Sequence, residues 1–172
     1  SDSDSGQDLA LLRIRKKGFA TASASFFLAS DIPAPGVELY HVGSLLGQFG
    51  SNSLTSGVVS QLGRVYNSQV FDQVTTSSFP GSSGGGVFLK DGRYVGMLVR
   101  GAGETFSLMV PVRRMHMWAK QARVEWAIDD SIPAPSAEEL RKMPIEDVGA
   151  VFTRETSPGE RVEFPFLIRR VP

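Results

Sequence analysis

The middle of the chain alternates short apolar runs with glycine-containing turns. Runs rich in β-branched and aromatic residues, bounded by turn residues, are typical of antiparallel strands. We expect six strands, at residues 37–42, 53–62, 65–76, 87–89, 94–100 and 105–110. Six short strands of this kind predict a closed six-stranded antiparallel β-barrel, so the predicted fold class is all-β.

A helical pattern follows the last of these strands. Pro111 favours a helix start, and apolar residues then recur at helical spacing. They are Val112, Met115, Ala119, Ala122 and Trp126. Arg113, Arg114, Lys120 and Arg123 lie off this stripe. We therefore expect a helix with an apolar face on the barrel and a basic face in solvent.

The last 44 residues carry a separate pattern after the proline-rich stretch around Pro133 and Pro135. Ser136 and Glu139 have the spacing of a capping box, which predicts a short helix to about Lys142. Residues 148–154 and 161–168 favour two strands around a Ser-Pro-Gly turn. Such a tail is too short for a core of its own, so we expect it to lie on the barrel or on a partner.

The main candidate for chemistry is the stretch Gly81-Ser82-Ser83-Gly84-Gly85, which lies between two predicted strands. The strand after it leads into Asp91-Gly92, a strong hairpin signal. A nucleophilic serine needs backbone N–H groups directed at the oxyanion it creates, and glycines allow the sharp turn that directs them. The alternative is an ordinary flexible glycine-serine loop, but a linker is not expected between two strands.

Three motifs in order resemble trypsin-like serine proteases, most closely the cysteine-free bacterial high-temperature-requirement type. They are the strand opened by Asp8, residues 8–14; the stretch Leu54–Ser60; and the glycine-serine loop with its hairpin and the strand 95–101. The resemblance covers roughly residues 8–126. It implies that this chain holds the second barrel of a double-barrel protease and only the last strand of the first.

The resemblance assigns roles to individual residues. Ser83 would be the nucleophile, the N–H groups of Gly81 and Ser83 would form the oxyanion hole, and Asp8 would orient the catalytic histidine. Ser77 would lie at the base of the specificity pocket. Residues Val99, Arg100 and Gly101 would pair with an extended polypeptide substrate. A serine at the pocket base favours a small or apolar residue before the scissile bond.

Ser82 departs from the animal digestive relatives, which carry an aspartate there that pairs with a freed N-terminal amine. A serine cannot make that ion pair, so we expect no amine-triggered activation. Whether the loop is preformed is left open by the sequence.

The catalytic histidine is missing from its expected place. In the trypsin-like order it precedes the aspartate, and residues 1–7 contain none. His41 gives the order aspartate, histidine, serine of subtilisin-like proteases, but its neighbourhood is predicted as strand and turn rather than a helix start. His116 lies on the predicted helix. We therefore expect an upstream N-terminal fragment of the same precursor to pair with residues 9–14 and supply the histidine.

This interpretation sets the expected domain boundaries. Residues 1–30 would be the end of the first barrel and the inter-barrel linker, residues 31–128 the second barrel with its helix, and residues 129–172 the linker and tail. The expected function is a serine endopeptidase. Two alternatives remain: a catalytically inactive, protease-like binding or structural module, and a plain Greek-key barrel with a fortuitous glycine loop.

The composition of the chain bears on which classes of binding partner are expected. Lysine plus arginine and aspartate plus glutamate are 18 each, so the net charge of zero does not favour nucleic acid or an anionic membrane. No apolar run has the ~20 residues that a membrane helix needs. No cofactor or metal site is expected, and there is no cysteine to form a disulfide. Oligomerisation and compartment are left open.

Overall fold

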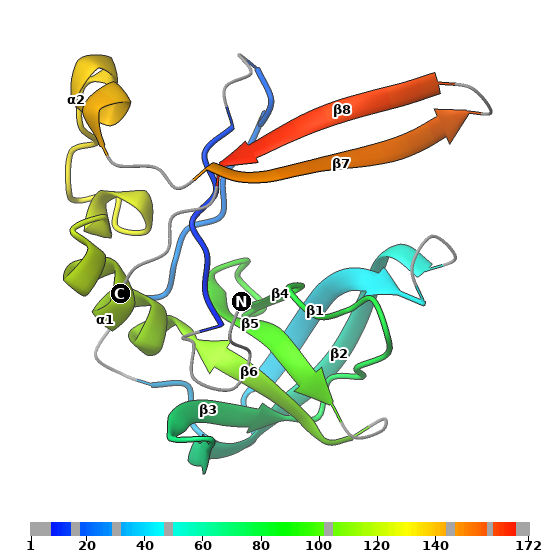
Figure 1. The fold of residues 1–172 in the computed structure, drawn as a ribbon. Coiled ribbons are helices and arrows are strands. Elements are labelled where there is room, and N and C mark those ends of the chain that lie inside the picture. Colours follow the sequence, from blue (N-terminus) through cyan, green and yellow to red (C-terminus); the bar gives the residue numbers. More distant parts are fainter. Residues whose placement is uncertain are drawn as a thin grey trace. The chain divides into compact units, whose positions relative to one another are not determined.

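The computed structural model describes residues 8–14, 18–28, 32–46, 50–101, 105–143, 147–157 and 160–167. The chain forms two compact units. One is built on Ala24–Pro133 and contains the six strands β1–β6 with helix α1 (Figure 1). The other combines Asp8–Ser23 with Ala134–Pro172. Among the described residues, no helix is long and apolar enough to cross a membrane.

The larger unit is a six-stranded antiparallel barrel. Its strands are β1 (Glu38–Leu45), β2 (Gly50–Tyr66), β3 (Gln69–Val74), β4 (Gly86–Phe88), β5 (Tyr94–Gly101) and β6 (Ser107–Pro111). Their order is β1-β2-β3-β6-β5-β4, and β4 pairs back with β1 from Tyr40↔Phe88 to Val42↔Gly86. The predicted six-stranded antiparallel fold is therefore confirmed.

The barrel is filled by the inward-facing residues of its strands. Successive side chains of a strand point to opposite faces of the sheet, so every second side chain points to the interior. The fully buried or nearly buried core residues are Leu39, Val59, Val74, Val87, Val95, Leu98 and Met109. Burying each such side chain contributes about 1.5–3 kcal/mol, and this core fixes the register of the strands that carry the glycine-serine loop.

The boundary between the second and third strands differs from the prediction. The sequence break at Gly63 suggested a turn, but β2 continues to Tyr66, and Gly63 instead lies in a bulge with φ 68°. The turn comes at Asn67 and Ser68, whose φ angles are 47° and 59°. Positive φ at both central residues is the geometry of a tight type I′ hairpin, which asparagine tolerates well.

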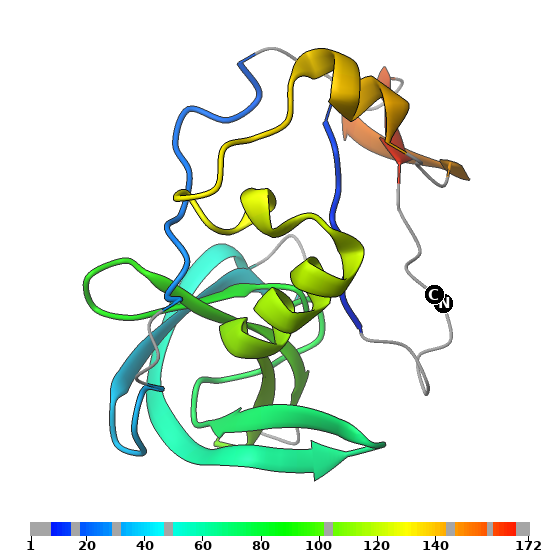
Figure 2. The ribbon, with the colours of Figure 1, turned by 90° about the vertical axis from the view of Figure 1, so that its left-hand side faces the viewer.

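Helix α1 (Val112–Ala122) begins where predicted and ends earlier. Pro111 is its N-cap, and α1 packs against β5 and β6 (Figure 2). Arg123 takes the left-handed conformation, φ 56°, and ends the helix. Trp126, expected on the helical stripe, lies in the short 3₁₀ helix η1 (Glu125–Ala127).

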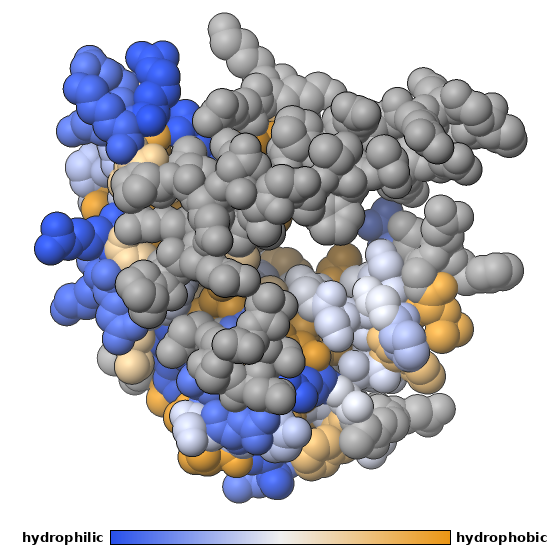
Figure 3. Space-filling model, in the orientation of Figure 1, coloured by the Kyte–Doolittle hydropathy of each residue, from blue (hydrophilic) through white to orange (hydrophobic). Residues whose placement is uncertain are grey.

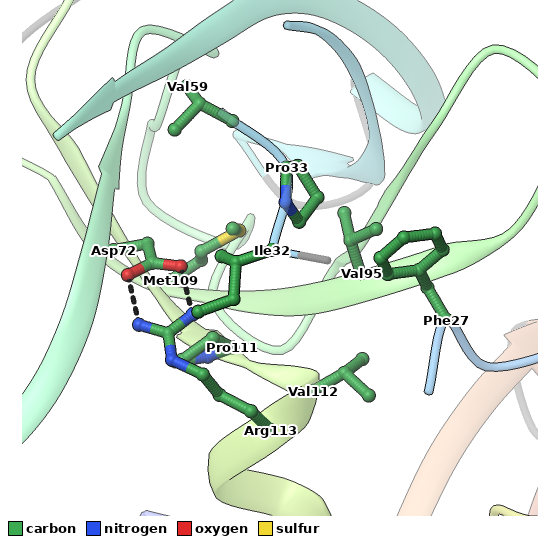
Figure 4. A pocket seen from close by; sticks show the side chains of 10 residues that line it. All are labelled: Phe27, Ile32, Pro33, Val59, Asp72, Val95, Met109, Pro111, Val112 and Arg113. Atoms are coloured by element: carbon green, nitrogen blue, oxygen red, sulfur yellow. Dashed lines mark hydrogen bonds and ion pairs between the residues drawn. The ribbon is translucent and has the colours of Figure 1, made fainter. Parts of the chain in front are cut away.

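The expectation of a wholly solvated basic face on α1 is wrong for two arginines. Arg114 is buried, and its guanidinium lies 4.8 Å from the centroid of the Phe71 ring. Arg113 forms a bidentate pair with Asp72, which is 1% exposed (Figure 4). Oδ1 of Asp72 also accepts a hydrogen bond from the Gly63 amide at 3.0 Å. One buried carboxylate therefore joins the β2 bulge, β3 and α1.

Figure 4 shows this ion pair in the wall of a pocket at the α1 end of the barrel. The remaining lining is apolar, including Phe27, Val95 and Met109. An apolar lining strengthens the attraction between the two charges and also raises the cost of leaving either one alone.

The smaller unit contains the predicted short helix and hairpin. Helix α2 (Ala137–Lys142) has the full capping box, with Ser136 and Glu139 each bonded to the other's backbone N–H. Strands β7 (Asp147–Ser157) and β8 (Glu160–Leu167) pair antiparallel. Arg13 Nη1 donates to the Leu140 carbonyl at 2.6 Å, which links the N-terminal segment to α2.

The segment 9–14, expected to pair with upstream polypeptide, is not part of a strand in this chain. Only Leu12 has an isolated bridge. Exposure still alternates as in a strand, with Leu12 46% and Ile14 45% exposed. No described residue forms a ladder with this segment, so its apolar face is left open, as expected for a strand without its sheet.

Replacing Arg113 with alanine should destabilise the chain by about 2–4 kcal/mol, because it leaves the Asp72 carboxylate buried without its cation. This loss is smaller than the ~3–5 kcal/mol typical of breaking a fully buried ion pair, because the Arg113 side chain is itself 33% exposed. Urea denaturation of the whole chain measures the effect. Lys120→Ala, an exposed lysine on the same helix, is the control and should cost less than about 0.5 kcal/mol. Equal losses in both variants would contradict a stabilising role for the pair.

Candidate functional site

The glycine-serine loop is anchored to β5 by its backbone. The Gly84 amide donates to the Leu98 carbonyl at 2.7 Å, and the Leu98 amide donates to the Gly85 carbonyl at 2.9 Å. Gly84 has φ 88°, a conformation that glycine adopts without strain. This reciprocal pair of bonds places the residues after Ser83 directly on the strand predicted to bind substrate.

The Ser82 side chain shapes the same loop from inside. Ser82 is fully buried, and its hydroxyl donates to the Phe79 carbonyl at 2.5 Å and accepts from the Phe79 amide at 3.0 Å. The Ser82 amide also donates to the Phe79 carbonyl. The loop is therefore formed through local hydrogen bonds, without the carboxylate–amine pair that the sequence showed to be impossible here.

Ser83 is exposed at the tip of this buried framework. Its hydroxyl donates to the Val99 carbonyl at 3.2 Å. The structure thus brings together two of the residues singled out from the sequence, the candidate nucleophile and the first residue of the candidate substrate strand.

The amides of Gly81 and Ser83 are both unused: neither donates a hydrogen bond to another described residue. The carbonyl on the other side of each peptide plane is held. The Pro80 carbonyl accepts from the Leu46 amide at 2.8 Å, and the Ser82 carbonyl accepts from the Gly85 amide at 3.0 Å. In a trans peptide the C=O and N–H point in opposite directions, so holding each carbonyl fixes the direction of the following N–H. Both donors remain for an external acceptor.

The other residues of the candidate substrate strand have different surroundings. A Cβ at Gly101 would lie 2.4 Å from Cβ of Ser78, so β5 passes very close to the segment before the loop. Ser77, half-buried, is in that segment. The guanidinium of Arg100 lies 5.0 Å from the centroid of the Tyr66 ring, a cation–π contact. The substrate roles of Ser77, Arg100 and Gly101 stay predictions.

Asp8 belongs to the other compact unit, where it is exposed and has φ 51°. Its proposed role toward a histidine also stays a prediction.

Neither histidine of the chain is bonded to Ser83. His116 is half-buried on α1. His41, on β1, is fully buried, and its Nδ1 lies 3.3 Å from Oγ1 of Thr55. Sequence reasoning considered His41 only as a triad histidine and missed its position against the loop. The alternation of β1 would have indicated an inward side chain, but not what it contacts.

The His41 ring lies between two glycines and the Ser82 backbone. A Cβ at Gly85 would be 2.4 Å from Nε2, and one at Gly43 would be 2.8 Å from it. Burial lowers the pKa of His41 from its ordinary value, and a hydrogen-bonding contact from the Ser82 backbone partly opposes this by raising the pKa. The neutral imidazole is therefore the favoured form inside the fold.

Exposed apolar side chains gather where β1 and β2 meet beside the loop. Leu46, whose amide bonds to Pro80, is 63% exposed, and Leu54 on β2 is 65% exposed. Figure 3 shows apolar surface at this end of the barrel. In the part of the chain that the structure describes, no three histidine, aspartate or glutamate side chains group as metal ligands.

Comparison with known protein families gives a match over more than half of the chain. The model of the trypsin-like peptidase domain matches residues 1–97 of the 172-residue chain. The resemblance identified from the sequence is therefore confirmed. No curated protein matches the chain.

Solved structures of HtrA-type proteases share the fold. AlgW with a tripeptide is 20% identical with a TM-score of 0.50, covering 62% of this chain and 37% of that one. AlgW with a serine-to-alanine substitution and a tripeptide is 16% identical with a TM-score of 0.51, covering 80% of this chain and 42% of that one. The same substituted protein with a decapeptide is 16% identical with a TM-score of 0.52, covering 79% of this chain and 38% of that one. The chain thus spans about two fifths of the length of these structures.

Acidification should destabilise the fold through His41. Because its folded pKa is lowered, the unfolded chain takes up a proton near pH 6.5 that the folded chain resists, so the free energy of unfolding falls as the pH drops from 7 to 5. Urea denaturation at several pH values measures this slope. His41→Leu should reduce this slope. Equal slopes in the wild type and His41→Leu would contradict the assignment.

Proposed function

Because the chain belongs to the trypsin-like peptidase family, we propose that the intact protein is a serine endopeptidase with Ser83 as its nucleophile. The observation that carries the proposal is the combination of an exposed Ser83 hydroxyl with two unused amides on a loop whose carbonyls are held. Those are the two requirements of acyl transfer by a serine: a reachable nucleophile and preorganised donors for the oxyanion.

The reaction follows from these groups. Ser83 Oγ attacks the carbonyl carbon of the scissile peptide as its proton passes to a histidine base. The N–H groups of Gly81 and Ser83 stabilise the oxyanion, each worth ~10²–10³ in rate. The proton is then delivered to the leaving amine, the C–N bond breaks, and water hydrolyses the resulting ester on Ser83 by the reverse sequence of proton transfers.

The substrate is proposed to be an extended polypeptide. Residues Val99–Gly101 at the end of β5 are next to Ser83, and main-chain pairing with such a strand binds peptides of varied sequence. The HtrA-type structures of similar fold hold a tripeptide and a decapeptide. The half-buried Ser77 supports a small or apolar residue before the scissile bond.

The histidine base is proposed to come from upstream polypeptide of the same precursor, with Asp8 orienting it. Two observations support this. His41 is buried and His116 lies on α1, and neither is bonded to Ser83. Segment 9–14 presents an exposed apolar face of Leu12 and Ile14, which pairing strands from a first barrel would cover.

Ser83→Ala in the intact protein should abolish peptide hydrolysis, a loss of roughly 10⁶ in kcat as for other triad knockouts. Ser83 is exposed, so folding should be unchanged, which circular dichroism and the unfolding midpoint check. Ser60→Ala removes another exposed serine, on β2, and should retain full turnover. Normal hydrolysis by Ser83→Ala would show that the nucleophile is assigned wrongly.

A fluorophosphonate probe separates the source of the base from the identity of the nucleophile. The intact protein should be labelled at Ser83, and residues 1–172 alone should be labelled far more slowly, because an unactivated serine is a weak nucleophile. Equal labelling of the two would rule out an upstream base. Absence of labelling in the intact, folded protein would instead favour the inactive binding module.

A further inference from the structure

His41 occupies a place where an apolar side chain would be expected. It lies on β1, fully buried, between its ladder partners Thr55 and Val87. Burying a polar ring costs free energy unless its nitrogens are bonded. The ring also requires that Gly43 and Gly85 have no side chains, because a Cβ at either position would come within 2.8 Å of it. A slot bounded by two glycines holds this ring against the glycine-serine loop.

The role of the ring depends on which of its two nitrogens carries the proton. Nδ1 faces the Thr55 hydroxyl at 3.3 Å, and a hydroxyl is able to donate to an unprotonated ring nitrogen. When the hydroxyl donates to Nδ1, the proton of the neutral ring is on Nε2. This atom has no standard hydrogen bond to a described residue, yet the Ser82 backbone is close enough to affect its titration. Nε2 is therefore a buried ring nitrogen without a hydrogen-bond partner among the described residues.

Nε2 and the Ser82 carbonyl oxygen converge on the same small space. The Cβ position of Gly85 would be 2.4 Å from Nε2 and 2.9 Å from that oxygen. The oxygen already accepts from the Gly85 amide at 3.0 Å, and a carbonyl has a second lone pair for another donor. An Nε2–H is the donor placed to use it.

The Ser82 carbonyl matters because it belongs to the same peptide group as the Ser83 N–H. The peptide is planar and trans, so the two bonds point in opposite directions. If the carbonyl turned away from the interior, the N–H would turn with it and leave the oxyanion site. Whatever holds the Ser82 carbonyl inward therefore holds the Ser83 donor outward.

We propose that His41 is a positioning residue for the oxyanion hole: its Nε2–H binds the Ser82 carbonyl from inside the barrel and so keeps the Ser83 N–H directed at the oxyanion. The inference rests on the proposed function of Ser83. His41 does not touch the substrate. It acts on the transition state through the peptide group that joins Ser82 to Ser83.

The tautomer is tested without any catalysis. In the full chain carrying His116→Gln, His41 is the single remaining histidine, and long-range ¹H–¹⁵N NMR of its ring at pH 7 reports which nitrogen is protonated. The expected result is a protonated Nε2 and an unprotonated Nδ1. A protonated Nδ1 with a bare Nε2 would overturn the proposal, because Nε2 would then have no proton to donate to the carbonyl.

The catalytic consequence is tested in the intact protein with two substitutions. His41→Leu removes the donor but keeps an apolar side chain of moderate size, and should lower kcat about 10- to 100-fold with KM within twofold, less than the ~10²–10³ for deleting an oxyanion donor. His41→Gln places an amide N–H near the position of Nε2 and should restore most of kcat. His116→Gln is the matched control and should match the wild type.

Unchanged kcat in His41→Leu, or equal losses in the leucine and glutamine variants with both folded by near-UV circular dichroism, would overturn the positioning role. If either variant does not fold, the NMR tautomer decides. Failure of the proposed function is separate, since it would appear as hydrolysis by Ser83→Ala while the His41 tautomer is still Nε2-protonated.

Discussion

The glycine-serine loop depends on one geometrical constraint, the planarity of the peptide group. The N–H donors of Gly81 and Ser83 are useful only if their directions are fixed, and neither donates to another residue in the part of the chain that the structure describes. The structure fixes them from behind, by bonding the Pro80 carbonyl to Leu46 and the Ser82 carbonyl to Gly85. Preorganisation of this kind is what makes such donors effective, because no reorientation is needed during the reaction. In our proposal, the buried His41 adds a second donor to the Ser82 carbonyl.

A second constraint acts at the end of the barrel that contacts α1 (Figure 4). The Asp72 carboxylate accepts from the Gly63 bulge and from Arg113 on α1. A buried charge of this kind is costly unless all its partners are present, so the bulge, strand β3 and helix α1 are stable only together. Since β3 leads directly into the segment containing Ser77 and Ser83, this polar cluster contributes to the position of the loop while lying away from its chemistry.

The sequence predicted those features that depend on local pattern. Strand positions, the Asp91-Gly92 hairpin, the capping box at Ser136 and the Ser83 loop all follow from periodicity and turn residues, and the structure contains them. Features that depend on tertiary contacts were missed. Arg113 was assigned to solvent because helical spacing cannot reveal a carboxylate on another strand. The role of Ser82 and the slot around His41 were likewise invisible, since they arise where β1 and the loop meet.

In the proposed enzyme, the oxyanion donors and the histidine base are positioned by different parts of the protein. The oxyanion donors are oriented by bonds within the Ala24–Pro133 unit, from Leu46, Gly85 and the β5 backbone. A histidine base arriving from elsewhere would activate Ser83 but would not have to build the loop. Substrate pairing and oxyanion binding would therefore survive loss of the base, as in enzymes where binding and the oxyanion hole retain ~10³–10⁴ of the rate enhancement without the triad.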